Sequence, residues 1–220
     1  MEELIEKEQM LETMRVPHYE QQYDFTCGPA SLMMIFKHFD NKFKFSTQIE
    51  TDIWRESSLA PLPPTSRYGL AFSALKRGYR AEILTNVIGI EYVNKTPARL
   101  TGDRSGMMQM FLGMMQAQFE ERKKRSLELG LKEKKVRNIG VASVIDAIER
   151  SGLSIMLTSA RFFEDEDWAH WVVVTGHDGS NVYINDPGSM SNKGRRIFPT
   201  KDFEKINGYY GDQVLISIFP

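Results

Sequence analysis

Apolar residues in the first half of the chain recur with helical spacing. Residues 28–39 are apolar on nearly every side, and Pro29 lies in the first turn, where its missing N–H costs nothing. This pattern predicts a buried central helix with Cys27 at its N-terminus. Shorter amphipathic patterns, each followed by a glycine, predict helices at residues 68–77 and 141–150.

The segments around these helices are polar or rich in proline. Residues 16–26 have no helical period and predict a loop that leads into Cys27. Residues 59–65, LAPLPPT, predict a rigid surface loop. Residues 1–14 mix apolar and charged side chains, which predicts a short amphipathic helix packed on the body of the protein.

A long helical pattern occupies residues 105–138. Its first half is rich in methionine and its second half is dense in charge. Methionine fills irregular gaps in cores, so core packing is the favoured interpretation of the first half, with a lid or partner-docking role as the alternative. The basic residues 132–137 are expected to form a solvated helix face or a mobile segment.

The last third of the chain changes to a β pattern. Residues 178–180, Asp-Gly-Ser, predict a three-residue hairpin loop within it, and residues 79–84 predict an earlier strand. Helices followed by antiparallel strands indicate an α+β domain. Four segments enriched in Val, Ile, Tyr and Trp are predicted strands, namely residues 153–158, 169–177, 181–185 and 213–219.

Composition narrows the class of function. A chain of 220 residues with 41% hydrophobic content can bury one ample core, so a single domain spanning residues 1–220 is expected. The 28 Lys and Arg nearly balance the 29 Asp and Glu, which argues against binding to nucleic acid or an anionic membrane. The sequence offers no signal peptide and no membrane span, and its single cysteine allows no internal disulfide, so a cytoplasmic location is expected.

Cys27 is the candidate nucleophile. Only the thiolate attacks efficiently, and the free N–H groups and dipole of a helix N-terminus favour a negative charge there. Gly28 is interpreted as leaving space for a substrate backbone beside the sulfur. Taken alone, however, a cysteine before an apolar helix is more often a buried core residue.

A candidate base and orienting group follow in the predicted hairpin. If residues 178–180 form a three-residue loop, His170 lies opposite Gly188 and Asp186 is its diagonal neighbour on the same face. A nucleophile needs such a base, and the base needs an orienting group. A histidine in an apolar strand is otherwise a core or edge residue.

Acyl transfer also needs hydrogen-bond donors aimed at the developing oxyanion. The backbone N–H of Cys27 can supply one donor. The side-chain amide of Gln21 or Gln22 can supply the second, although both fit an ordinary solvated loop equally well.

Two segments carry a resemblance to a known family. Residues 21–31, QQYDFTCGPAS, closely resemble the Q-x5-C-G-P-A-S block of the peptidase C39-like family, and residues 170–174 followed by Asp186-Pro187 resemble its histidine block. The resemblance implies a papain-like α+β fold, with the cysteine at a helix N-terminus and a C-terminal antiparallel sheet. By position it also implies four roles: Cys27 as nucleophile, Gln21 as oxyanion donor, His170 as base and Asp186 as orienting residue.

The activity implied by this resemblance is that of a stand-alone cysteine peptidase or amidase, working through an acyl-enzyme on Cys27 without a cofactor. Its substrate would be a peptide or amide, with small residues such as glycine at the cleavage site. Residues 105–138 have no counterpart in the motifs and would be a helical insertion. An acyltransferase of transglutaminase type with the same residues, or a catalytically silent peptide-binding module, are the alternatives.

The remaining candidates favour structural roles. The other histidines, His18, His38 and His177, are dispersed, and one cysteine gives none of the tight ligand pairs that metal sites show, so no metal site is expected. The acidic run at residues 164–167 precedes His170 and is expected to be a solvated loop, with recognition of a basic substrate residue as the alternative. The sequence leaves the oligomeric state open.

Overall fold

A large mixed sheet organises the protein in the computed structural model, which describes residues 15–87, 89, 106–163, 167–188 and 194–220. Within this part of the chain the strand order is β4-β3-β9-β5-β6-β7-β8. Every neighbouring pair is antiparallel except β3 and β4, which are parallel. The α+β class and the antiparallel C-terminal part of the sheet agree with the sequence prediction.

The elements have the following bounds. The strands of the large sheet are β3 (Arg80–Thr85), β4 (Lys132–Lys135), β5 (Leu153–Ser159), β6 (Ala169–His177), β7 (Asn181–Asn185), β8 (Arg195–Pro199) and β9 (Val214–Phe219). The α-helices are α2 (Cys27–Phe39), α3 (Thr47–Ser57), α4 (Arg67–Lys76), α6 (Gly106–Glu128), α7 (Val141–Glu149) and α8 (Phe203–Ile206). The described residues also form two short 3-10 helices, η1 (Ala160–Phe162) and η3 (Thr200–Asp202), and a small hairpin of β1 (Ser58–Leu59) and β2 (Leu62–Thr65).

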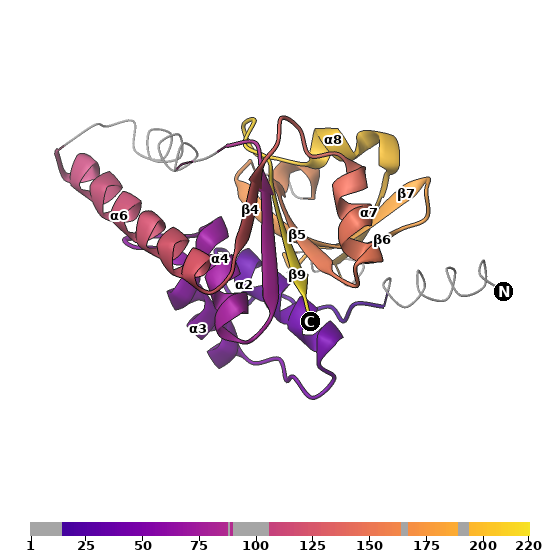
Figure 1. Ribbon diagram of the computed structural model, residues 1–220, viewed down its shortest axis with the longest axis horizontal. Coiled ribbons are helices and arrows are strands. Elements are labelled where there is room, and N and C mark those ends of the chain that lie inside the picture. Colours follow the sequence, from indigo (N-terminus) through magenta and orange to yellow (C-terminus); the bar gives the residue numbers. More distant parts are fainter. Residues whose placement is uncertain (1–14, 88, 90–105, 164–166, 189–193) are drawn as a thin grey trace.

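Helices cover both faces of the sheet, and two hydrophobic cores result. In Figure 1, α2, α4 and α6 lie on one side of β3, β5 and β9, and α7 and α8 lie on the other. Strand β6 serves both cores, because its successive side chains point to opposite faces. Trp171 and Val173 join the core under α2, whereas Val172 and Val174 join the core under α7 and α8.

The central helix α2 is held against β6 and α4. Its first ten residues, 27–36, are all buried, and the Ser31 hydroxyl donates to the Trp171 carbonyl of β6 at 3.2 Å. A Cβ on Gly28 would lie 2.6 Å from Thr65 Oγ1 and 2.9 Å from Leu70 Cδ2. The space beside Gly28 is therefore filled by the protein itself, and the interpretation that it leaves room for a substrate is wrong.

Only the first part of the charged half of the long helical pattern is helical. Helix α6 ends at Glu128, and Gly130 then adopts φ +93°, a left-handed conformation that suits glycine. Lys132–Lys135 continue as β4, which pairs in parallel with β3. Backbone hydrogen bonds to a neighbouring strand thus override the local helical preference. The exposed lysines lie on an edge strand, where charge discourages pairing with other chains.

Other expectations have mixed outcomes. The predicted helices at residues 68–77 and 141–150 are α4 and α7, and the predicted strands correspond to β3, β5, β6, β7 and β9. The expected surface loop at residues 59–65 instead contributes to the β1–β2 hairpin, while α3, β8 and α8 are additional elements. The predicted amphipathic helix at residues 1–14 lies outside the described residues. Among the described helices, none has the length and hydrophobicity needed to cross a membrane.

Candidate active site

The β6–β7 hairpin carries the candidate base and orienting group, but its turn differs from the prediction. The Asp178 N–H donates to the Asn181 carbonyl at 3.1 Å, and His177 pairs with Val182. The predicted three-residue loop, in which His177 faces Asn181, is therefore wrong. The Asp178 carboxylate accepts the backbone N–H groups of Ser180 and Asn181, and this local bonding favours the tighter turn.

A β-bulge between the turn and His170 shifts the pairing of β6 and β7 by one residue. The pairing shifts between Val174 and Gly176, and beyond that point Val173 lies opposite Asn185. A bulge adds one residue to one strand of a pair and so shifts the pairing by one residue. The side chains beyond the bulge therefore lie on the opposite face from the one that the pairing at the turn would give them. The register toward the open end of the hairpin is the one predicted from the sequence, although the turn is not.

His170 and Asp186 therefore meet on one face of the hairpin. The Nε2–H of His170 donates to Asp186 Oδ1 at 2.7 Å, and both side chains are buried. The backbone N–H of Gly188 donates to the same oxygen at 2.9 Å. The second oxygen, Asp186 Oδ2, is buried and has no hydrogen-bond partner. This arrangement fixes the imidazole ring through a single, well-placed acceptor.

The backbone of Asp186 is held from two sides. The Nε2–H of His18 donates to its carbonyl at 2.9 Å, and its N–H donates to the Gly194 carbonyl at 2.7 Å. Gly194 adopts φ +67°, and a Cβ there would collide with the His18 ring. Sequence reasoning assigned His18 no role, because a histidine beside Pro17 gives no sign of a contact so far along the chain.

Cys27 lies at the first position of α2 and is buried together with His170. Burial opposes a charge on the imidazole, but hydrogen bonds and charge interactions with Asp186 and Cys27 outweigh it and raise the pKa of His170 from 6.5 to about 10. The ring of Phe163 lies 5.8 Å from that of His170, centroid to centroid. The three predicted residues Cys27, His170 and Asp186 are thus brought together.

The two candidate oxyanion donors have different surroundings. The Gln21 amide Nε2 donates to the Tyr23 carbonyl at 3.0 Å, while its Oε1 is buried without a hydrogen-bond partner. The backbone N–H of Gln21 donates to the Pro187 carbonyl at 2.9 Å, directly after Asp186. The Gln22 side chain is exposed and donates to the Glu20 carbonyl. Gln21 is therefore tied to the hairpin that carries Asp186, and the Gln22 side chain points into solvent.

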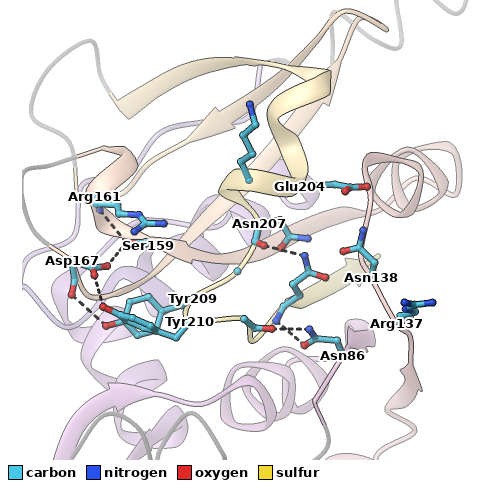
Figure 2. Close-up of a pocket in the computed structure, with 14 residues that line it drawn as sticks. Asn86, Arg137, Asn138, Ser159, Arg161, Asp167, Glu204, Asn207, Tyr209 and Tyr210 are labelled. Atoms are coloured by element: carbon cyan, nitrogen blue, oxygen red, sulfur yellow. Dashed lines mark hydrogen bonds between the residues drawn. The ribbon is translucent and has the colours of Figure 1, made fainter. Parts of the chain in front are cut away.

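A separate polar cavity of about 570 Å³ opens near the start of β6 (Figure 2). Its lining includes Arg137, Arg161, Asp167 and Asn207 but none of the four predicted site residues. The Asp167 carboxylate accepts hydrogen bonds from Ser159 at 2.7 Å and from Tyr210 at 2.5 Å. Asp167 is the described member of the acidic run at residues 164–167, and these hydrogen bonds hold it in a polar network.

No group of three or more His, Cys, Asp and Glu side chains within the described ranges could hold a metal ion. Amide side chains in the lining of the polar cavity bond to neighbouring loops; Gln213 Oε1, for example, accepts the Ile139 N–H at 2.9 Å.

The sheet, the buried helix that begins at a cysteine and the His–Asp pair on an adjoining hairpin define an α+β protein of the papain-like class. A family model described as the Peptidase_C39 like family matches residues 16–209, and the chain belongs to this family. A search of the curated proteins gave no match to this sequence.

Solved structures support the same fold. The peptidase domain of Streptococcus ComA, a bi-functional ABC transporter involved in a quorum sensing pathway, aligns with a TM-score of 0.53 and 13% identity, over 94% of this chain and 99% of that chain. A Bacillus anthracis protein described as a C39-like peptidase aligns with a TM-score of 0.50 and 15% identity, over 94% and 96%. At this identity the likeness establishes the fold alone.

Proposed function

We propose that the protein is a cysteine peptidase or amidase that opens a peptide or amide bond through an acyl-enzyme on Cys27. The observation that carries the proposal is the buried His170, which hydrogen-bonds Asp186 and whose pKa is raised by its interactions with Asp186 and Cys27. A base held between a nucleophile and an orienting carboxylate is the arrangement that activates nucleophiles in acyl transfer. Membership of a peptidase-like family supports the same assignment.

In this proposal, His170 and Cys27 react as an ion pair. With a pKa of about 10, the His170 ring is protonated at neutral pH, and its positive charge favours the thiolate form of its neighbour. Asp186 holds the Nε2–H of the ring, which leaves Nδ1 to exchange a proton with Cys27 and the substrate. Asp186 thereby sets both the ring's orientation and its tautomer.

The chemical steps then balance within the site. The Cys27 thiolate attacks the carbonyl carbon, and the scissile C–N bond breaks as His170 gives its proton to the leaving amine. The acyl group remains on Cys27 as a thioester. Water, deprotonated by His170, attacks this thioester, and the carboxylic acid leaves while the thiolate and the imidazolium are restored.

The developing oxyanion needs donors, and two are proposed. The Cys27 backbone N–H, in the first turn of α2, has no carbonyl acceptor within its own helix. The amide Nε2 of Gln21 has two N–H groups, one of which is used by Tyr23. Its second N–H is proposed to serve the oxyanion. Preorganised donors of this kind are often the largest electrostatic contribution to acyl transfer.

The family also guides the proposed substrate. We propose, from the family resemblance, a peptide substrate with small residues such as glycine beside the scissile bond. The single cysteine supports a proposed cytoplasmic location. No cofactor is required by the steps above.

Product analysis tests the proposal. Wild type and Cys27→Ala would each be incubated with a peptide mixture that includes glycine-rich sequences, with and without added methylamine, and the new chain ends identified by mass spectrometry. New free carboxyl ends that depend on Cys27 would support a hydrolase. Methylamide ends in place of free acids would make the protein a transferase, and no products at all would favour the peptide-binding module.

A further inference from the structure

A buried carboxylate on α3 gathers three hydrogen bonds from the loop that precedes Cys27. Glu50 is fully buried. Its Oε1 accepts the Gln22 backbone N–H at 2.9 Å and the Thr26 hydroxyl at 2.5 Å. Its Oε2 accepts the Tyr19 hydroxyl at 2.9 Å. Residues 19–26, from which all three donors come, are called here the 19–26 loop.

No cation balances this charge among the described residues, since the contacts of Glu50 there are these hydrogen bonds. A carboxylate is costly to bury unless its oxygens are well bonded, so a surface position or an apolar residue would be the cheaper choice for the fold alone. What the carboxylate provides here is a single acceptor for three donors of one short loop. It therefore fixes the shape of that loop.

Contacts within the 19–26 loop connect Glu50 to Gln21, a proposed oxyanion donor. The Thr26 hydroxyl lies 2.8 Å from the Tyr23 carbonyl, and the Thr26 N–H donates to the same carbonyl at 3.0 Å. That carbonyl is also the acceptor for Gln21 Nε2. A continuous chain of contacts thus runs from Glu50 through Thr26 and Tyr23 to Gln21.

This chain of contacts links the two proposed oxyanion donors. Thr26 is the residue directly before Cys27, whose backbone N–H is one donor, and Gln21 supplies the other. The second anchor of the loop, from the Gln21 N–H to the Pro187 carbonyl, keeps it beside Asp186. Any change in the turn at residues 22–26 would therefore move both donors relative to each other.

We propose that Glu50 is a positioning residue, whose carboxylate shapes the 19–26 loop so that the Gln21 amide and the Cys27 N–H point at one oxyanion. This inference rests on the proposed function. Glu50 does not touch the reacting atoms and acts through Thr26 and Tyr23. Sequence reasoning assigned it no role, because neither helix α3 nor the burial of its acidic residue was predicted.

Two reagents separate positioning from simple support of the fold. Acylation of Cys27 by p-nitrophenyl acetate passes through an oxyanion, whereas alkylation by iodoacetamide does not, so the ratio of the two rates reports on the donors. In Glu50→Ala this ratio should fall at least about tenfold, with alkylation within about twofold of wild type. Glu50→Gln keeps an acceptor oxygen for Gln22 and Thr26, so its ratio should stay within about threefold of wild type.

A double-mutant cycle tests the route through Gln21. Gln21→Ala should lower the ratio by about a hundredfold, the effect of losing one oxyanion donor. Because Glu50 is proposed to position Gln21 as well as the Cys27 N–H, the loss in the double variant should be clearly smaller than the product of the two single losses, since coupled residues are not additive. Additive losses would overturn the inference, and so would parallel losses of acylation and alkylation in Glu50→Ala.

A second pair of variants applies if Glu50→Ala fails to fold. Thr26→Val removes the hydroxyl that links Glu50 to Tyr23 and should lower the ratio of acylation to alkylation. Tyr19→Phe removes a donor to Glu50 outside that link and should leave the ratio within about twofold of wild type. Equal ratios for the two variants would overturn the inference. If wild-type Cys27 reacts with neither reagent, the proposed function itself fails, a result distinct from an active site that is insensitive to Glu50.

Discussion

Replacing Asp186 by asparagine should lower the pKa of His170 while leaving the shape of the site unchanged. Asparagine is nearly isosteric with aspartate, and its carbonyl oxygen can still accept from His170 Nε2 and from the Gly188 N–H. The substitution therefore removes the negative charge and keeps the hydrogen-bond geometry. It isolates the electrostatic part of what Asp186 does.

The size of the effect follows from the environment of His170. The pKa of His170 is raised from the ordinary 6.5 to about 10. Burial opposes this rise, and interactions with two groups, Asp186 and Cys27, produce it. A neighbouring opposite charge shifts a pKa by about 1–3 units, so removing the charge of Asp186 should lower the pKa of His170 by about that much, or about 1–4 kcal/mol between the two protonation states.

An NMR titration of protein labelled with ¹⁵N-histidine measures this directly and needs no substrate. The chain has four histidines, and His170→Gln would assign the resonance of interest. Asp178→Asn is the matched control, because it makes the same change in the same hairpin at an exposed carboxylate that bonds only near the turn. The titration should run from about pH 5 to about pH 11 to cover both the ordinary and the raised value.

The reasoning would be refuted by either of two results. A His170 pKa in Asp186→Asn within about half a unit of wild type would show that the carboxylate does not sustain the charge. A wild-type His170 that titrates near 6.5 would show that the interactions with Asp186 and Cys27 do not outweigh the effect of burial. The control variant should leave the His170 pKa unchanged.

Three further predictions concern packing. Gly69→Ala should destabilise the protein by about 1–3 kcal/mol, because a Cβ there would collide with the backbone of Ser57. Gly113→Ala should stabilise it by about 0.5–1 kcal/mol, since that helical position has open space around it; urea denaturation of both variants checks the opposite signs, and equal signs would contradict them. Ser31→Ala should cost about 1–3 kcal/mol by leaving the buried Trp171 carbonyl without its donor, and an unchanged urea midpoint would show that this bond contributes nothing.

Features with a local cause were predictable from the sequence. The apolar run after Cys27 predicts α2 because burial on all sides needs no knowledge of the partner. The Val- and Ile-rich segments predict β6 and β7 with their observed bounds, because β-branched side chains favour strands whichever segment they pair with. These elements carry Cys27 and His170, and Asp186 follows β7 directly.

Features set by distant contacts were not predictable. The strand at Lys132–Lys135 depends on pairing with β3, which no local pattern reveals. The β-bulge between Val174 and Gly176 depends on the packing of the sheet. It restores the predicted pairing near His170 although the turn differs from the prediction. The contact of Gly28 with Thr65 and the burial of Glu50 likewise arise only when separate elements meet.

The most direct test of the account is whether His170 activates Cys27. Wild type, His170→Ala and His177→Ala would be treated with iodoacetamide at about pH 6, well below the value of about 8.5 at which a free cysteine ionises. His177 is the matched control, because it lies at the far end of the same strand. Mass spectrometry would locate and quantify the adduct on Cys27.

The account predicts rapid alkylation of Cys27 in wild type and His177→Ala, and its loss in His170→Ala. A Cys27 that stays unreactive in all three proteins until they unfold, or that reacts equally in all three, would contradict it.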